Sequence, residues 1–305
     1  LYNDLVADVM DEMLATTLHL KVARILEQRV GDLERAAAAY LRLLDLDPGQ
    51  MEAIEALEQI YTRSGDNERL VEILLRRAEA EMDADERKSL LNRAAALYEE
   101  VLEQPEEAIN AYRQILEVDE RDLGALDALD RLYVDQERWG DLRDHYMRKV
   151  ELADTPEEKK DLYFGVGQIY EEQLEDLDRA IEVYTSVLDL DPEDALALDA
   201  LDRLYQQGER WYDLMQILDK QVELTGGTSA ESVEYRHRIG DLWQLQLGDL
   251  ARAVETYRGV LAIDPTHEGS LAALDKLVQG DEEAVMAAQV LEPIYEQAME
   301  YEKLA

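Results

Sequence analysis

The sequence predicts an all-α fold, a solenoid of about eight antiparallel helix pairs with a period of 72 residues for every two pairs. Three markers recur in one register along the 305-residue chain. The nonapeptide ALDALDRLY stands at 125–133 and again at 197–205. A tyrosine in an amphipathic context recurs at 40, 112, 184 and 257, and an acidic stop such as DLDP follows it at 45–48, 117–120, 189–192 and 262–265. Self-similarity at a fixed period is typical of repeat architectures.

Each repeat divides into two helix pairs, because the pattern helix, tight turn, helix can be followed twice within it. We expect the chain, 1–305, to form a single solenoid with repeats at about 12–83, 84–155, 156–228 and 229–283. An atypical extra helical segment is expected at 284–305. Both ends interrupt the pattern, and we therefore expect the chain to be a segment of a longer protein.

The starts of the second helix in several pairs can be predicted from capping residues. GDLERA, EDLDRA and GDLARA place Asp32, Asp176 and Asp249 where a side-chain oxygen can accept from the free N–H groups of a first turn. In the second repeat Gln104 replaces the aspartate and Pro105 takes the first helical position. DP pairs predict helix ends, since proline biases the residue before it away from helix.

The repeated nonapeptide predicts a helix that is buried on two sides. At 100° per residue its apolar positions cover an arc of about 160°, whereas a surface helix needs about 100°. These positions in the first copy are Ala125, Leu126, Ala128, Leu129, Leu132 and Tyr133. The wider arc indicates neighbours on both sides, as in a stack of helix pairs.

The stretch FGVGQIYEEQLEDLDRAIEVYTSVLDLDP at 164–192 resembles the tetratricopeptide repeat. The residues that match the family's first helix are Val166, Gly167 and Tyr170, and those that match its second helix are Ala180, Tyr184, Val187 and Pro192. In the second half-repeat Leu201 and Tyr205 fit the pattern, but Asp202 replaces the glycine and Leu214 replaces the alanine.

The resemblance extends over essentially the whole chain. It implies a right-handed superhelix in which the first helices line a concave groove that binds partner segments. The motif is specific for architecture and says little about function.

The charge of the chain excludes some classes of partner. A formal net charge of −40 repels phosphate backbones and anionic membranes and favours basic partners, cations or a high-salt setting. Salt adaptation and a basic partner remain alternative reasons for this acidity. The absence of cysteine excludes disulfides and thiolate metal sites, and no stretch reaches 18 apolar residues. We expect no membrane insertion, no nucleic-acid binding and a cytoplasmic location.

No enzyme motif can be recognised, so we expect neither catalysis nor a cofactor or metal. GVG at 165–167 is interpreted as close helix packing and TGGTS at 225–229 as a lengthened loop between helices. The four histidines are expected to lie far apart and fit no zinc spacing. His237 and Asp241 could bind a metal weakly, but a solvent-facing helical pair is the preferred interpretation.

Trp139 and Trp211 recur in ERWGDL and ERWYDL, 72 residues apart. An aromatic residue at this period is interpreted as a wedge between successive helix pairs. An exposed contact with a partner is the alternative.

A polar row provides the candidate binding residues. Gln59, Arg131, Arg203 and Lys276 occupy equivalent positions, and Asp127 and Asp199 precede the two arginines by four residues. The preferred interpretation is an acid-to-base pair on one helix, worth about 0.2–0.5 kcal/mol. The functional alternative is a basic stripe along the groove that holds an acidic segment.

The sequence thus predicts a non-catalytic scaffold for protein–protein interaction. It would dock partner segments in the concave groove, on the acidic surface, or on both. The partner would be basic or would carry an acidic segment held by the arginine row. A purely architectural helical spacer within a larger multidomain protein is the alternative.

Overall fold

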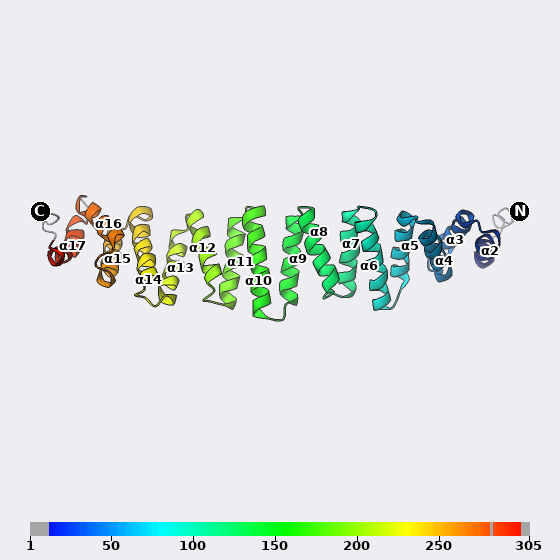
Figure 1. Ribbon diagram of the computed structural model, residues 1–305, viewed down its shortest axis with the longest axis horizontal. Coiled ribbons are helices and arrows are strands. Elements are labelled where there is room, and N and C mark those ends of the chain that lie inside the picture. Colours follow the sequence, from blue (N-terminus) through cyan, green and yellow to red (C-terminus); the bar gives the residue numbers. More distant parts are fainter. Residues whose placement is uncertain (1–11, 281–282, 300–305) are drawn as a thin grey trace. The chain divides into compact units, whose positions relative to one another are not determined.

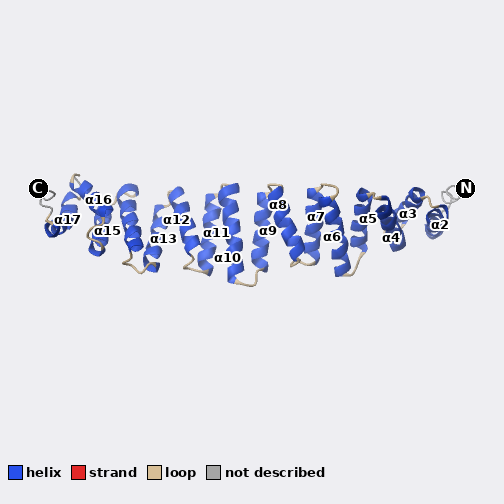
Figure 2. Cartoon of the chain, in the orientation of Figure 1, coloured by secondary structure: helices blue, strands red, loops and turns tan. Residues whose placement is uncertain are grey.

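The computed structural model describes residues 12–280 and 283–299, and this part of the chain contains sixteen α-helices and no strand (Figures 1 and 2). It divides into two compact bodies, Leu1–His145 and Tyr146–Ala305. The sixteen helices form eight consecutive pairs, and the predicted all-α repeat solenoid is confirmed. No described helix has the length and apolar character needed to cross a membrane.

In the N-terminal body the first helices of the pairs alternate with the second helices. The first helices are α2 (Glu12–Ile25), α4 (Met51–Ser64), α6 (Ala84–Glu100) and α8 (Leu123–Asp135). The second helices are α3 (Leu33–Leu46), α5 (Asn67–Ala80), α7 (Pro105–Val118) and α9 (Trp139–Leu152), whose last residues enter the C-terminal body. A π-helical turn, η1 (Leu26–Val30), extends α2.

The C-terminal body continues the same order. Its first helices are α10 (Pro156–Gln168), α12 (Ala195–Gln207), α14 (Ala230–Asp241) and α16 (Glu268–Val278). Its second helices are α11 (Leu177–Leu190), α13 (Trp211–Leu224), α15 (Leu250–Ile263) and α17 (Ala284–Ala298). The π-helical turns η2 (Ile169–Gln173) and η3 (Leu242–Gln246) extend α10 and α14. Each helix of this body packs against the next one along the chain.

The predicted helix starts are confirmed. Asp32, Asp176 and Asp249 each accept a hydrogen bond from the backbone N–H three residues later, at 3.0–3.1 Å. Pro105 opens α7 without a side-chain cap from Gln104. The segment 225–229 connects α13 to α14 as the predicted loop.

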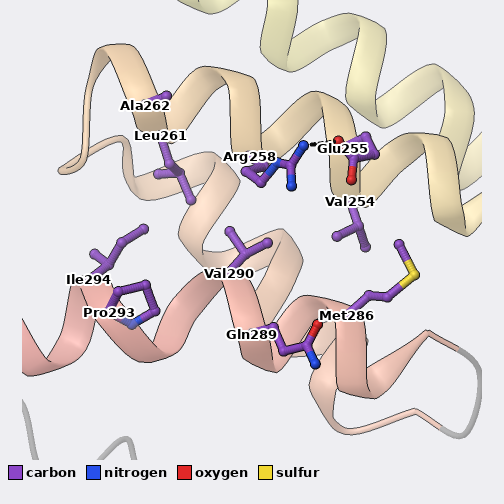
Figure 3. A pocket seen from close by; sticks show the side chains of 10 residues that line it. All are labelled: Val254, Glu255, Arg258, Leu261, Ala262, Met286, Gln289, Val290, Pro293 and Ile294. Carbon is purple, nitrogen blue, oxygen red and sulfur yellow. Dashed lines mark hydrogen bonds and ion pairs between the residues drawn. The ribbon is translucent and has the colours of Figure 1, made fainter.

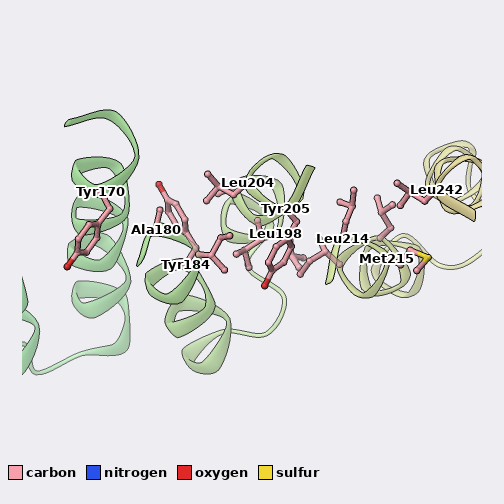
Figure 4. Close-up of a cluster of buried hydrophobic side chains, with 14 of the residues drawn as sticks. Tyr170, Ala180, Tyr184, Leu198, Leu204, Tyr205, Leu214, Met215 and Leu242 are labelled. Carbon is pink, nitrogen blue, oxygen red and sulfur yellow. The ribbon is translucent and has the colours of Figure 1, made fainter. Parts of the chain in front are cut away.

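The wide apolar arc of the repeated nonapeptide is buried as predicted. All six of its apolar positions are buried in α8 and again at the equivalent positions in α12. In the C-terminal body, the α12 side chains join a core that runs from α10 to α14 (Figure 4). Trp211 is partly buried and packs against this core, as a wedge would.

Glycine in the first helices allows the second helices to come close. A Cβ atom on Gly167 would lie 2.6 Å from the ring of Tyr184, and one on Gly240 would lie 2.4 Å from the ring of Tyr257. The GVG segment therefore serves helix packing, as predicted. At the equivalent positions of the first two repeats the small residue is a fully buried alanine, Ala23 or Ala95.

The segment 284–305 was expected to be an atypical addition, but its described part continues the repeat. α17 begins at Ala284, which is 73 residues after the start of α13 at Trp211. It packs against α16 and α15 as the second helix of the eighth pair. The phase was misjudged because Ala284 replaces the tryptophan that marks this position in the two middle repeats.

Every described turn between the two helices of a pair contains one left-handed residue. Three of these residues are Gly31, Gly65 and Gly248, and the other five are Glu103, Glu137, Glu175, Glu209 and Glu283, with φ of 52–54°. A side chain in this conformation costs about 1–2 kcal/mol relative to glycine in the folded state.

We predict that Glu175→Gly stabilises the protein by about 0.5–1 kcal/mol, because relief of the left-handed strain exceeds the extra entropy of glycine in the unfolded chain. Gly65→Ala should destabilise it by about 1 kcal/mol, since no atom lies within 4 Å of the new Cβ and the cost comes from the backbone alone. Thermal unfolding of both variants checks this. A lower melting temperature for Glu175→Gly would contradict it.

Candidate partner-binding surface

The six predicted binding residues all lie exposed on first helices. Gln59 is on α4, Lys276 is on α16, and the two acid–arginine sets are on α8 and α12. The repeat therefore presents one equivalent position on the first helix of every second pair. The four residues at this position lie on four different helices. Within each body, no hydrogen bond or ion pair between described residues connects one of them to another.

The arginines of this row pair with a neighbouring helix instead of with the aspartate four residues earlier. Arg131 of α8 binds the carboxylate of Glu99 at the end of α6. Arg203 of α12 binds Glu171 of η2 with both guanidinium Nη atoms, one at 3.0 Å. The predicted pairing within one helix was wrong, because the preceding first helix offers a glutamate whose side chain is only 20% exposed. Such a glutamate needs a cation more than the exposed aspartate does.

A tyrosine of the second helix completes this arrangement. The Tyr112 hydroxyl donates to the second carboxylate oxygen of Glu99 at 3.3 Å. In the next repeat, burial and the nearby carboxylate of Glu171 raise the pKa of Tyr184 to about 12. We call this arrangement of arginine, glutamate and tyrosine the Arg–Glu–Tyr cluster; it connects two helix pairs in each of the two middle repeats.

The outer repeats retain the tyrosine but replace the arginine, and the last repeat also replaces the glutamate. Tyr40 donates to Glu27 at 2.7 Å, but the residue at the arginine position is Gln59. The Tyr257 hydroxyl lies 2.8 Å from Gln244 Oε1, and the residue at the arginine position is Lys276. The sequence did show the glutamates in the same register as the arginines, 32 residues before them. That spacing was the signal that could have revealed the cluster.

Ion pairs also connect the first helices at the alternate junctions. Glu58 of α4 binds Arg93 of α6 at 2.7 Å and Arg77 of α5 at 2.7 Å. Burial raises the pKa of Glu58, but the two guanidinium groups outweigh this and lower the pKa overall. In the C-terminal body Arg238 of α14 binds Asp202 of α12 with two hydrogen bonds, at 2.6 and 2.7 Å.

Lysines fasten the helix starts in the same way. Lys160 of α10 binds Asp191 at 2.8 Å and Asp194, the N-cap of α12, at 2.9 Å. Lys88 binds Asp119 and Asp122 at the start of α8 in the equivalent way. The hydrogen bonds to the two aspartates raise the pKa of Lys160. Much of the positive charge on the first helices thus serves to connect helices.

Exposed carboxylates remain beside the Arg–Glu–Tyr cluster of the C-terminal body. Glu172 follows Glu171 and is exposed, and Asp199 is exposed one turn before Arg203. Asp199 accepts a hydrogen bond from Gln221 of α13 at 3.1 Å. Among the described residues neither carboxylate forms an ion pair, so negative charge predominates around the neutralised pair.

Two histidines that were expected to lie apart are in contact. The rings of His237 on α14 and His267, before α16, have centroids 4.8 Å apart. His237 is also not solvent-facing, since 13% of its side chain is exposed, although its Nε2 atom does lie 3.5 Å from Asp241. The sequence spacing of 30 residues gave no indication of this contact, because it arises from the stacking of α16 against α14.

The histidine contact does not form a catalytic or metal centre. Ser270 Oγ lies 3.1 Å from His237 Nδ1, an arrangement of serine, histidine and Asp241 that resembles a nucleophile with its base. Ser270 has no exposed surface, however, and a substrate could not reach its hydroxyl. Within the described residues no three His, Asp or Glu side chains are arranged to hold a metal ion.

A hollow of about 310 Å³ lies between α15 and α17 (Figure 3). Val254 and Leu261 of α15 and Val290 and Ile294 of α17 form its apolar walls. The ion pair between Arg258 and Glu255, 2.5 Å long, lies at its edge.

Three stretches of the chain match models of the tetratricopeptide repeat. They are residues 53–88, 161–194 and 233–267. The second and third stretches cover α10 with α11 and α14 with α15, the pairs that contain Gly167 and Gly240. A comparison with curated proteins gives no match.

The solved structures that match this chain share little sequence with it. A repeat protein from Cytophaga hutchinsonii is 13% identical, with 83% of this chain and 98% of that chain covered and a TM-score of 0.35. PilF of Pseudomonas aeruginosa is 15% identical, with 87% and 99% covered and a TM-score of 0.31. YrrB, a tetratricopeptide-repeat protein with an unusual peptide-binding site, is 22% identical, with 60% and 90% covered and a TM-score of 0.28.

We predict that Arg203 is energetically coupled to Glu171 and not to Asp199. In a double-mutant cycle, Arg203→Ala with Glu171→Gln should give a coupling of about 0.5–1 kcal/mol, since the guanidinium is 56% exposed and solvent screens the pair. Arg203→Ala with Asp199→Asn is the matched control and should give a coupling near zero. A larger coupling to Asp199 in urea unfolding would restore the pairing within one helix.

Proposed function

We propose that this tetratricopeptide-repeat protein is a non-catalytic scaffold that docks a basic segment of a protein partner along the exposed faces of its first helices. A role in protein–protein interaction is what the repeats themselves support. That the partner segment is basic is a separate inference, which the repeats alone do not support. It comes from the distribution of charge around the candidate residues.

The observation that carries this proposal is the pairing of Arg203 with Glu171. An acidic segment would have to displace Glu171 from the guanidinium and would leave that poorly exposed carboxylate without its cation. It would also have to approach a chain with a formal net charge of −40. A basic segment needs no displacement, because Glu172 and Asp199 are exposed beside the neutral pair.

The architectural spacer is the second candidate. It is favoured by four arginines that connect one first helix to the preceding first helix, Arg93, Arg131, Arg203 and Arg238. A spacer would not discriminate between carboxylates on first and second helices. The two candidates can therefore be separated by binding measurements on matched variants.

We predict that a dodecapeptide rich in lysine and arginine binds the protein and that Glu172→Gln/Asp199→Asn weakens its affinity about fivefold, at about 0.5 kcal/mol for each of the two lost contacts. Glu182→Gln/Asp189→Asn removes two exposed carboxylates from the second helix α11 and is the matched control. Fluorescence anisotropy with a labelled peptide measures both. Equal weakening by the two double variants would support non-specific attraction and contradict docking on the first helices.

We further predict that the affinity for this peptide falls about tenfold or more when salt is raised from about 0.05 to 0.5 M, because the Debye length becomes much shorter than 10 Å. An all-glutamate peptide of the same length should show no measurable binding at either salt concentration. Tighter binding of the glutamate peptide would instead support the arginine row as the site for an acidic segment.

A further inference from the structure

The junction between the last two described first helices, α14 and α16, differs from the equivalent junctions of the two middle repeats. Between α10 and α12, and between α6 and α8, a lysine binds two aspartates, one of which caps the second of the two helices. At the last junction Val233 occupies the position of Lys160, and His267 occupies the position of the capping Asp194. A valine thus replaces the lysine, and a histidine replaces the aspartate that caps the second helix.

His267 caps α16 through a ring nitrogen. The backbone N–H of Ser270 donates to His267 Nδ1 at 3.1 Å. A backbone N–H can act only as a donor, so this bond requires an unprotonated Nδ1 and places the ring proton on Nε2. His267 Nε2 faces Glu234 at 3.4 Å, where that proton can be donated.

The second histidine is connected to the same cap. The Ser270 hydroxyl lies 3.0 Å from His267 Nδ1 and 3.1 Å from His237 Nδ1, and it bridges the two rings. The His237 ring also lies against the first turn of α16, where a Cβ on Gly269 would be 2.7 Å from its Nε2 atom. Both rings are mostly buried, with 13% and 15% of their side chains exposed.

We propose that this histidine cap is a pH-sensitive switch that holds the last helix pair, α16 with α17, in place at neutral pH and releases it when His267 becomes protonated. A proton on His267 Nδ1 removes the acceptor of the cap bond. The new ring N–H then points at the backbone N–H of Ser270. It also places a positive charge at a helix N-terminus, where the helix dipole disfavours it. α17 packs against α16, and loosening of α16 therefore reaches both helices.

The charged and titratable groups around the rings set the range of this switch. Carboxylates face them from Glu234 and Asp241 of α14 and from Asp264 in the loop before α16, and the first two favour the charged form of His237. Tyr257 of α15 donates to Asp241 at 2.7 Å and stays neutral, since burial and this bond raise its pKa. Burial lowers the pKa of His237, outweighing Asp241 and Glu234, and the neighbouring His267 adds to the lowering.

The sign of the effect follows from these directions. A histidine with a lowered pKa in the folded state binds fewer protons there than in the unfolded chain. Its contribution to stability is complete above the unfolded pKa of about 6.5 and is lost as the pH falls below that value. The cap bond of His267 acts in the same direction, because it exists only with the neutral ring.

Hydrogen exchange tests the switch with an internal control. Protection of the α16 amides, corrected for the pH dependence of intrinsic exchange, should fall about 2- to 30-fold between pH of about 7.5 and 5.5, the range that corresponds to loss of a cap. The amides of α12 should keep their protection over the same range, because aspartate and lysine ordinarily have pKa values well outside it. Equal changes in α12 and α16 would overturn the proposal.

The variant His267→Asn identifies the responsible group. Its side-chain oxygen can cap the helix but does not titrate, so the acid-induced loss of protection in α16 should shrink to the part that His237 contributes. Ring ¹⁵N shifts of the unmodified protein provide a test that does not depend on this variant and should show His267 protonated at Nε2 at neutral pH. A proton on Nδ1, or an acid-induced loss as large in His267→Asn as in the unmodified protein, would refute the switch.

Discussion

The close approach of the two helices in each odd-numbered pair determines much of the remaining structure. A tyrosine of the second helix packs on a small residue of the first, and with Gly167 and Gly240 there is no room even for one more carbon atom. This contact buries the ring and directs its hydroxyl toward the end of the first helix, where Tyr40, Tyr112 and Tyr257 all find an oxygen acceptor. A larger residue at the small position would separate the helices and move the hydroxyl away from that acceptor. One packing requirement thus places a polar group identically in each repeat.

The polar connections between pairs follow from this placement. In the two middle repeats a largely buried glutamate, Glu99 or Glu171, lies at this end of the first helix and needs a cation, which the next first helix supplies as Arg131 or Arg203. Neither member has to be explained by a ligand, because each satisfies the other. This is why the exposed arginine row is weak support for an acidic partner. It is also why the unpaired carboxylates beside it, Glu172 and Asp199, are better guides to what a partner would carry.

The sequence was sufficient to predict features that depend on one helix or on the repeat period. The capping aspartates, the buried arc of ALDALDRLY and the packing role of GVG depend on local spacing and are confirmed. Contacts between stacked first helices were missed or assigned to the wrong partner, as with Arg131 and Asp127. A side chain as long as arginine can reach either its own helix or the next one, and the sequence alone does not show which acceptor is more buried. The contact between His237 and His267 was missed for the same reason, since it depends on how α16 stacks on α14.

Departures from the repeat are more informative about function than the repeat itself. Where the lysine and two aspartates recur, the junction has the same chemistry. Its ion pairs connect one first helix to the start of the next. At the last described junction the geometry is kept while the chemistry changes, since His267 accepts from the backbone of α16 as Asp194 does from that of α12. An aspartate would have served a purely structural cap, and it would have kept its acceptor at every pH near neutrality. Replacing it with histidine, next to a second histidine and a buried serine, makes the stability of one helix start depend on a proton. A cap whose purpose was stability alone would gain nothing from that dependence.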